Sequence, residues 1–395
     1  MARDPFALRP ADPSVRRLAN PAEAVTAAEV LARDWQDQAA AIDRSRQPPV
    51  DALRALAQSG LLAMTVPQVF GGAGVPTVTV ARVFFILGAA DLALAQVPQN
   101  HFDFVDTLVQ AAPEVQAFFY EEVLRGARFG NALAEPGRRS RRDLATTIVE
   151  TDGGYRITGR KFYSTGALTA DWVPVSALHA DGRIRTAYVR RDAPGLHVDG
   201  DWNAFGQRAT FSGTTVLDDV FVPGAHVVDR SRGHAGFLLA QFAGNQLIHA
   251  ALQVGSAEGS LAVAAELAGG DDRRLRSLGA RIAAARALVL RAARLVDAAL
   301  AAVLPGQDQA IAAAIAVDEA KSLTYELGPE IAIALPGFGG AEAVAAARRL
   351  DRHWRNARTH SLHDPVRWRQ HQVADFHLNG RLNPDLAARF GLPVS

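Results

Sequence analysis

The middle of the chain changes from a helical to a strand-like hydrophobic pattern and back again. Between residues 128 and 222, short segments alternate apolar and polar residues without a helical segment between them. Asp152-Gly153 and Ala180-Asp181-Gly182 lie between consecutive segments and favour hairpin turns. We therefore expect an antiparallel sandwich or barrel and not a Rossmann sheet. The expected strands are Phe129–Ala134, Ala145–Thr151, Tyr155–Ser164, Trp172–Leu178, Ile184–Arg190 and Thr214–Val222.

Helical patterns flank this β region on both sides. The first helix has clear start signals, with Asn20 as N-cap, Pro21 at the first helical position and Glu23 in a capping-box position. The expected N-terminal helices are Pro21–Arg46, Asp51–Ser59, Thr77–Gln96, Asn100–Ala111 and Pro113–Gly126. After the β region, four alanine-rich segments joined by short turns predict an up-and-down four-helix bundle. These segments are Phe237–Leu267, Leu275–Leu304, Gln307–Leu335 and Glu342–Arg355.

The chain thus predicts an α+β fold of three domains. Residues 1–127 would form an N-terminal helical domain, residues 128–229 a middle β-barrel or sandwich domain, and residues 230–395 a C-terminal four-helix bundle with a tail. A length of 395 residues fits two or three domains. The 49% hydrophobic content is typical of a well-buried globular protein.

Composition limits the partners that the chain is expected to bind. The net charge is +1, which gives no basic surface for nucleic acid or an anionic membrane. The absence of cysteine excludes disulfides, thiolate catalysis and zinc–cysteine or iron–sulfur sites. No apolar run approaches the ~18–20 residues of a membrane helix, and the first residues do not resemble a secretory signal. We expect a soluble, cytoplasmic protein that binds neither nucleic acid nor a membrane.

Four short motifs together resemble those of the acyl-CoA dehydrogenase superfamily. Asn131–Pro136 (NALAEP) resembles the family's first flavin strand, and Lys161–Trp172 resembles the second. Gly206–Pro223 resembles the third signature, including its terminal Asp-Val-x-Val-Pro. Pro336–Gly340 followed by Arg355–Arg358 resembles the Gly-Gly-x-Gly turn and the Arg-Asp-x-Arg that follows it. The resemblance covers residues 20–380 and implies the three-domain fold, a flavin and a homotetramer in which a neighbouring bundle completes the flavin site.

The chain departs from the dehydrogenases at the place of their catalytic base. In them a carboxylate removes the α-proton of the thioester, most often the Glu of a Glu-Gly-Thr shortly after Arg-Asp-x-Arg. Here Thr359–Pro365 reads THSLHDP and contains no Glu. The chain is therefore similar to the reduced-flavin monooxygenases, the branch that includes dibenzothiophene monooxygenase and the sulfur-acquisition oxidoreductases. Tyr163–Gly166 and Gln99–Phe102 resemble that branch as well.

This resemblance implies a two-component monooxygenase. A separate reductase would supply FMNH2, and O2 would react through a flavin C4a-hydroperoxide with a small, mostly apolar sulfur or nitrogen compound. FMN is favoured over FAD because Ala265–Arg276 (AELAGGDDRRLR) lacks the aromatic-plus-arginine segment that contacts flavin phosphates in relatives. Arg273, Arg274 and Arg276 remain as candidates for contacting the FMN phosphate.

The motifs also assign candidate residues to the site. Side chains that could hydrogen-bond the peroxide or substrate are the catalytic candidates, since imidazole both donates and accepts near neutral pH. They are His101, Asn131, Ser164, His360 and His363. Candidates for contacting the cofactor are Asn131, Leu133, Ala134, Tyr163, Ser164, Thr165, Trp202, Arg208, Ser212 and Arg358. Trp202 and Phe205 could stack over the ring or line the substrate pocket.

Each assignment has a structural alternative. Ser164 and Thr165 could cap backbone groups at a strand end, and His101 could be a helix cap or a core donor. His360 and His363 could bind a metal together with another histidine, but no carboxylate has the spacing of a metal motif, so no metal is expected. That further histidine would be His353, His371 or His377. Asn245 and His249, spaced i,i+4, could face the pocket or form a polar pair in the core.

Two other functions fit the same sequence. One is an acyl-CoA dehydrogenase whose base lies elsewhere, such as Glu258 or Glu319 on the bundle. The other is a flavin-free scaffold or binding protein that kept the fold. The basic loop Arg138–Arg142 could be a solvated loop or could meet an anionic substrate or the reductase.

Overall fold

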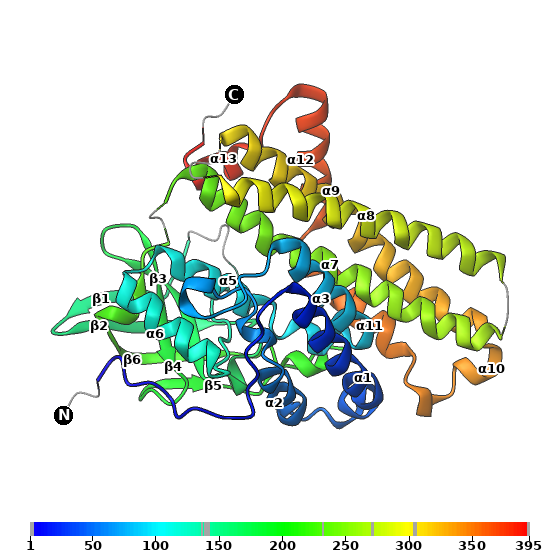
Figure 1. The fold of residues 1–395 in the computed structure, drawn as a ribbon, viewed down its shortest axis with the longest axis horizontal. Helices are drawn as coiled ribbons and strands as arrows, with labels where there is room; N and C mark the ends of the chain where they lie inside the picture. Colours follow the sequence, from blue (N-terminus) through cyan, green and yellow to red (C-terminus); the bar gives the residue numbers. More distant parts are fainter. Residues whose placement is uncertain are drawn as a thin grey trace.

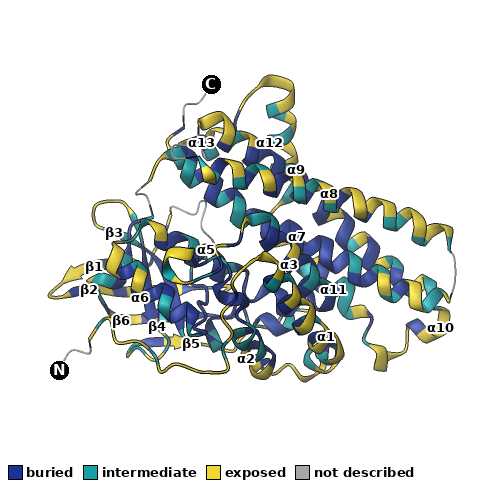
Figure 2. Ribbon diagram, in the orientation of Figure 1, coloured by how far each residue is buried: buried dark blue, intermediate teal, exposed yellow. Residues whose placement is uncertain are grey.

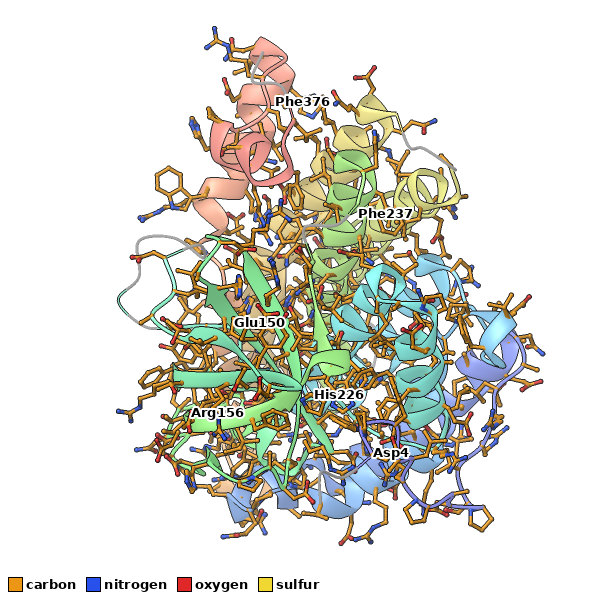
Figure 3. All side chains as sticks on the ribbon, turned by 90° about the vertical axis from the view of Figure 1, so that its left-hand side faces the viewer. Asp4, Glu150, Arg156, His226, Phe237 and Phe376 are labelled. Atoms are coloured by element: carbon orange, nitrogen blue, oxygen red, sulfur yellow. The ribbon has the colours of Figure 1, made fainter. Side chains whose placement is uncertain are left out.

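The computed structural model describes residues 4–135, 137, 143–230, 233–269, 272–302 and 306–392. A seven-stranded sheet occupies one end of the molecule, and three long helices extend away from it (Figure 1). Figure 3 views the molecule from the side of the sheet, with Glu150 and Arg156 on adjacent strands and Phe376 of the C-terminal region at the top. The predicted three-part α+β architecture is confirmed. The basic loop at 138–142 lies outside the described residues.

The N-terminal helices begin and end close to where the sequence predicts them. Glu23 N–H donates to Asn20 Oδ1 at 3.0 Å, which confirms the cap of the first helix. The predicted single helix Thr77–Gln96 is wrong, because it is interrupted at Asp91. Asp91 is extended (φ −158°), and its carboxylate accepts from Leu94 N–H at 2.8 Å, so it caps a second helix. The helices are α1 (Pro21–Ser45), α2 (Val50–Gln58), α3 (Thr77–Ala90), α4 (Leu92–Gln96), α5 (Gln99–Thr107) and α6 (Pro113–Leu124).

The strands form one sheet in the order β5-β6-β2-β1-β3-β4-β7. Neighbouring strands are antiparallel as predicted, except that β1 and β3 pair in parallel. Both predicted hairpin turns are present, with Gly153 and Gly182 at positive φ. The strands are β1 (Thr147–Thr151), β2 (Gly154–Lys161), β3 (Trp172–His179), β4 (Ile184–Arg190), β5 (Leu196–Val198), β6 (Thr215–Pro223) and β7 (Val227–Val228). The three-residue β5 and the two-residue β7 are too short for an alternating pattern to reveal.

The segment at Phe129–Ala134 was expected to be a strand, and this is wrong. It runs beside β3 with two isolated parallel bridges, Phe129 to Trp172 and Ala132 to Val175. A third bridge joins Ala134 to Phe162, just after β2. The segment thus lies between the ends of β2 and β3 without a continuous ladder, and this leaves some of its N–H groups available for other contacts.

Three long helices, α7 (Ala235–Ala268), α8 (Arg273–Ala301) and α9 (Gln307–Ala334), confirm the first three bundle segments. The predicted fourth helix, Glu342–Arg355, is wrong. It breaks into α10 (Gly340–Ala343), a 3-10 turn and α11 (Asp351–Ser361), because Arg349 takes a left-handed conformation (φ 51°) and its guanidinium pairs with a distant carboxylate. Two more helices follow, α12 (Val366–Asn379) and α13 (Pro384–Phe390).

Helix α3 of the N-terminal part packs closely against α7, the first of the long C-terminal helices. Burial in Figure 2 is concentrated on α3 and α7, whereas α8 exposes one side. Glycines allow the close approach of α3 to α7. A Cβ at Gly255 would come within 2.4 Å of Phe85 O, and one at Gly259 within 2.2 Å of Ala89 O. No helix of the described residues is long and apolar enough to cross a membrane.

Candidate active site

The chain turns sharply after β2 and is held there by the loop that precedes β6. Tyr163 (φ 53°) and Gly166 (φ 70°) both adopt the left-handed backbone conformation. The Ser164 and Gly166 N–H groups donate to the carbonyls of Gly213 (3.0 Å) and Thr210 (3.1 Å). A Cβ at Gly166 would lie 2.8 Å from a buried guanidinium, so both its conformation and its surroundings require glycine.

A row of hydroxyl groups continues from this turn into the loop before β6. Thr165 Oγ1 lies 2.8 Å from Ser212 Oγ, which donates to Thr210 Oγ1 at 2.7 Å. Thr210 Oγ1 donates to Gln207 O at 2.8 Å, and the same carbonyl accepts from the Trp202 indole at 2.8 Å. Because a hydroxyl has one proton, the row has one direction, with Thr165 as its first donor. The structure thus brings the candidates Thr165, Ser212 and Trp202 into one group.

Two buried polar atoms beside this turn have no hydrogen-bond partner among the described residues. They are Asn131 Oδ1 and Ser164 Oγ. The two residues are neighbours, since the Asn131 amide donates to the Tyr163 carbonyl at 3.4 Å. The Tyr163 ring is 58% exposed and lies edge-on to Trp202 at 6.2 Å. Because an unpaired buried polar atom costs roughly 1–3 kcal/mol, the pair is suited to contact the polar edge of a planar ligand.

The segment that carries Leu133 and Ala134 is anchored by a buried ion pair. Leu133 O accepts from Ser176 Oγ (3.1 Å) and Lys161 Nζ (3.4 Å), and Lys161 Nζ also lies 2.8 Å from Glu135 Oε1. Burial favours the neutral acid, but hydrogen bonds from Lys161 and two backbone N–H groups outweigh it and lower the pKa of Glu135 to about 2. The Leu133 N–H group has no partner among the described residues and can donate to a ligand, whereas Ala134 is bridged to Phe162, whose N–H donates to Ala134 O at 2.9 Å.

The loop before β6 also rests directly on α11. Gln207 N–H donates to Asn356 Oδ1 at 2.7 Å, and the Gln207 amide donates to Asn356 O at 3.4 Å. A Cβ at Gly206 would lie 2.0 Å from Arg355 O, so only glycine allows this approach. The row of hydroxyls at the end of β2 is therefore connected to the helix that carries the candidate histidines.

His360 and His363, near the end of α11, meet a third histidine from α7. His360 is 3% exposed, whereas His363 is exposed. His249 Nδ1 lies 3.2 Å from His360 Nε2, and the His249 ring stacks on His363 with centroids 4.5 Å apart. The Gln253 amide donates to His360 Nδ1 at 2.9 Å. Burial, followed by the charges of His363 and Lys321, holds the pKa of His360 well below its usual value.

The one carboxylate next to these histidines in the chain is held in ion pairs. Asp364 lies 2.9 Å from Lys321 Nζ and 2.8 Å from Arg369. Burial would raise the pKa of Asp364, but these two cations outweigh it and hold the pKa well below its usual range. Burial lowers the pKa of Lys321 to about 8. Asp364 is thus ionised at neutral pH and paired with two cations.

His101 lies in the interior with both ring nitrogens engaged. Nε2 lies 2.9 Å from Leu62 O, and Nδ1 accepts from Phe129 N–H at 3.0 Å. Burial lowers the pKa of His101 to about 3. Its ring packs on Phe102 and Phe129, so these contacts do not bring it together with His360 or His363. These contacts are those of a histidine that forms hydrogen bonds in the protein core, which is the structural alternative to a catalytic role for His101.

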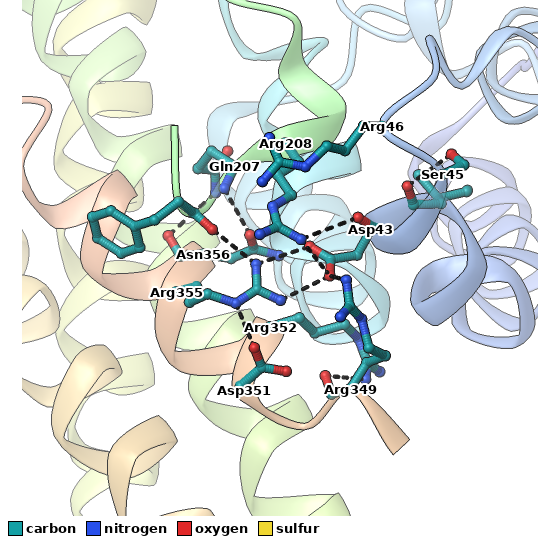
Figure 4. A network of polar contacts seen from close by, with 12 residues as sticks. Asp43, Ser45, Arg46, Gln207, Arg208, Arg349, Asp351, Arg352, Arg355 and Asn356 are labelled. Atoms are coloured by element: carbon teal, nitrogen blue, oxygen red, sulfur yellow. Dashed lines mark hydrogen bonds and ion pairs between the residues drawn. The ribbon is translucent and has the colours of Figure 1, made fainter. Parts of the chain in front are cut away.

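Arg208 belongs to an ion-pair network around Asp43 of α1 (Figure 4). Arg355 of α11 makes a bidentate pair with Asp43 (3.0 and 2.7 Å), and Arg349 lies 3.1 Å from it. Burial would raise the pKa of Asp43, but Arg355 and the other arginines outweigh it and lower it. Arg358 is exposed and lies 3.4 Å from Ser361 Oγ. The contacts of Arg208 and Arg358 therefore do not join Asn131 and Ser164.

The polar residues on one face of α7 are only partly recognisable from the sequence. Asn245, His249 and Gln253 are spaced four residues apart on α7, which places them on one face of the helix. The i,i+4 pair Asn245 and His249 was considered, but extending the repeat to Gln253 would have identified a polar stripe. Gln207 and Asn356 gave no such signal, because their contacts join distant parts of the chain.

Two further expectations concern bound ions and phosphate. Arg274 places its guanidinium 4.4 Å above the Phe338 ring, so it lies against the predicted glycine-rich turn at the far end of the helices. Among the described residues, no group of three or more His, Cys, Asp or Glu side chains is arranged to hold a metal ion.

Comparisons with known proteins place this geometry in a family. Residues 23–126 match the acyl-CoA dehydrogenase N-terminal domain, and residues 130–220 match the acyl-CoA dehydrogenase middle domain. A probable FMNH2-dependent monooxygenase, SfnC of Pseudomonas putida, is 31% identical over 91% of this chain and 96% of its own length.

Solved structures of two monooxygenases are also similar. FMN-bound TdsC from Paenibacillus sp. A11-2, a dibenzothiophene monooxygenase, superimposes with a TM-score of 0.86 at 27% identity, over 91% of this chain and 98% of that one. Methanesulfinate monooxygenase MsuC from Pseudomonas fluorescens gives a TM-score of 0.83 at 28% identity, over 91% and 97%.

Proposed function

The chain belongs to the acyl-CoA dehydrogenase family, and from this premise we propose that it is a two-component monooxygenase that uses FMNH2 and O2 to oxygenate a small sulfur- or nitrogen-containing compound. Its relatives support this class of substrate. TdsC acts on dibenzothiophene and has been seen with FMN and indole together, and MsuC acts on methanesulfinate.

One observation favours oxygenation over dehydrogenation: the carboxylates that could replace the missing base are already in ion pairs. Glu258 lies 2.7 Å from Arg286, and Glu319 lies 3.1 Å from Arg291. Asp364 is held ionised by two cations, which makes it a weak base. A dehydrogenase needs a free carboxylate to remove an α-proton, whereas a monooxygenase needs hydrogen-bonding groups, which the histidines on α7 and α11 provide.

The residues at the end of β2 fit the edge of a flavin ring. Asn131 Oδ1 can accept from a ring N–H, and Ser164 Oγ can donate to or accept from a ring atom, which satisfies both buried groups. The Leu133 N–H group, two residues after Asn131, adds a further donor. Trp202 is held by its indole hydrogen bond. Together with Tyr163 it borders the proposed flavin site and limits the access of water to the ring.

Reduced FMN supplies two electrons and activates O2 when it is bound, so that one oxygen atom reaches the substrate and the other leaves as water. The exposed His363 is proposed to orient the substrate and to hold a proton near the oxygen that is transferred, whereas His360, whose two ring nitrogens bond Gln253 and His249, is proposed to support it from the interior. A separate reductase provides FMNH2. The enzyme is a homotetramer in this proposal, and Arg274 at the glycine-rich turn of a neighbouring bundle contacts the FMN phosphate.

The proposed reaction is tested with isotopically labelled oxygen. FMNH2 is generated by an added flavin reductase, with dibenzothiophene, methanesulfinate and indole as probe substrates. We expect the product of at least one probe to carry a single oxygen atom from ¹⁸O2, measured by mass spectrometry, with no product when FMNH2 or O2 is omitted.

The rival functions give different results in the same protein. Bleaching of bound oxidised flavin by an acyl-CoA under anaerobic conditions would establish a dehydrogenase and reject the proposal. Absence of FMN and FMNH2 binding at micromolar concentrations would favour a flavin-free scaffold. Light scattering is expected to give four times the 42.1 kDa chain mass.

A further inference from the structure

The direction of the hydrogen bonds around His360 follows from one glutamine. Gln253 Nε2 lies 3.1 Å from Ala357 O and 2.9 Å from His360 Nδ1. A backbone carbonyl can only accept, so the nitrogen end of the Gln253 amide must face α11. His360 Nδ1 is then the acceptor of the second bond. Gly328 of α9 makes room for this arrangement, since a Cβ there would lie 2.2 Å from Gln253 Oε1.

The same reasoning extends to the next ring. His360 is buried and neutral, so with Nδ1 as an acceptor it must carry its proton on Nε2. That nitrogen lies 3.2 Å from His249 Nδ1, which therefore accepts. A neutral His249 then carries its proton on Nε2. The bonds run in one direction, from Gln253 to His360 to His249.

Charged neighbours do not oppose this pattern. Lys321 of α9 donates to Gln246 Oε1 (2.7 Å) and pairs with Asp364, which Arg369 also holds. Tyr325 of α9 packs its ring on His360 at 5.5 Å. The nearby anion, Asp364, is thus matched by two cations.

We propose that Gln253 and His249 are positioning residues of the active site, in which Gln253 fixes the proton pattern and His249 holds His363. The His249 ring is the platform on which the exposed His363 stacks, at 4.5 Å and 28° between planes. Its buried neighbour His360 fixes the orientation of that platform. The catalytic part of this inference rests on the proposed monooxygenase function, whereas the proton pattern does not.

The proton pattern is tested by solid-state ¹⁵N NMR on full-length protein labelled at histidine, with signals assigned from the His249→Phe and His360→Phe variants. We expect His249 and His360 to be Nε2–H tautomers near neutral pH. In Gln253→Met the His360 signal is expected to show a mixture of tautomers, and in Gln253→Glu, where a carboxylate accepts, the Nδ1–H form. Gly328→Ala, which displaces the amide without removing it, is expected to resemble Gln253→Met.

Gln246→Met is the matched control, because Gln246 is a buried glutamine two turns earlier on α7 that bonds Lys321 and no histidine. It should leave both tautomers unchanged. An Nδ1–H tautomer of His360 in the unmodified protein, or an unchanged pattern in both Gln253→Met and Gly328→Ala, would overturn the assignment.

The positioning role is tested by kinetics of the same variants. His249→Ala, which removes the platform, is expected to lower kcat about tenfold or more with KM changed by less than about threefold, and His249→Phe should restore part of kcat by stacking. Equal losses in both variants, or none in either, would reject the role. If the unmodified protein oxygenates nothing, the proposed function fails, but the tautomer result stands.

Discussion

Replacing Lys161 with methionine is expected to lower the free energy of unfolding by about 3 kcal/mol or more. Lys161 is fully buried, and its partner Glu135 has a side chain that is 4% exposed, so the variant leaves a buried carboxylate without its cation. Lys161 also donates to Ser176, and both contact Leu133 O, so the loss extends to the segment that carries Asn131. Urea unfolding at pH 7 measures the effect.

The pH dependence of this loss has a defined sign. The pKa of Glu135 is lowered to about 2 from an ordinary 4.5, so the pair contributes fully above pH 4.5 and its contribution is lost as the pH falls toward 2. The difference between the variant and the unmodified protein should therefore be smaller at pH 3 than at pH 7. The exposed pair Arg281 and Glu330 is the control, since Arg281→Met should cost less than about 1 kcal/mol. A similar cost at both sites would contradict the burial argument.

Replacing Asn131 with leucine is expected to weaken FMN binding about 10- to 100-fold. The variant removes an amide whose Oδ1 has no partner in the described protein, so a polar group of the ring would be left unpaired at a cost of roughly 1–3 kcal/mol. Quenching of FMN fluorescence on titration with protein measures the affinity. The fold should be little affected, because the one hydrogen bond that the Asn131 side chain donates within the described residues is long (3.4 Å).

A matched substitution on the same part of the sheet isolates the effect. Thr158 lies on β2, three residues before its end, but it is exposed. Thr158→Ala should bind FMN with unchanged affinity. Equal affinities of Asn131→Leu and Thr158→Ala, within about twofold, would remove Asn131 from the flavin site.

The elements that the sequence predicts well are those determined by local patterns. Alternation and the turns at Gly153 and Gly182 define the hairpins, and alanine-rich periodicity defines α7 to α9. The errors arise where a single polar residue interrupts a helical pattern, either through a local cap or through a distant ion pair. Asp91 caps a new helix inside an apolar run, and Arg349 leaves the helical conformation where its side chain pairs with Asp43.

In the candidate site, too, the residues within local motifs could be predicted, and those defined by contacts between distant parts of the chain could not. Ser164 and Thr165 were identified from a motif, and the structure places them beside Asn131 and Ser212. Gln253 was missed because its importance depends on facing Ala357, about one hundred residues away. His101 is buried with both nitrogens bonded, and no pattern around it distinguishes such a core histidine from a catalytic one.

The network around Asp43 has a consequence for how the chain denatures. One carboxylate of α1 is shared by Arg208 of the loop before β6 and by Arg349 and Arg355 at α11, so helical, sheet and C-terminal regions meet at a single anion. If one of these regions detached, Asp43 would be separated from at least one of its arginines, and both groups would lose an ion-pair partner. Proteins with several domains often melt in steps, but here the regions share one set of charges. We therefore expect these regions, which are separate in sequence, to unfold as a single cooperative unit.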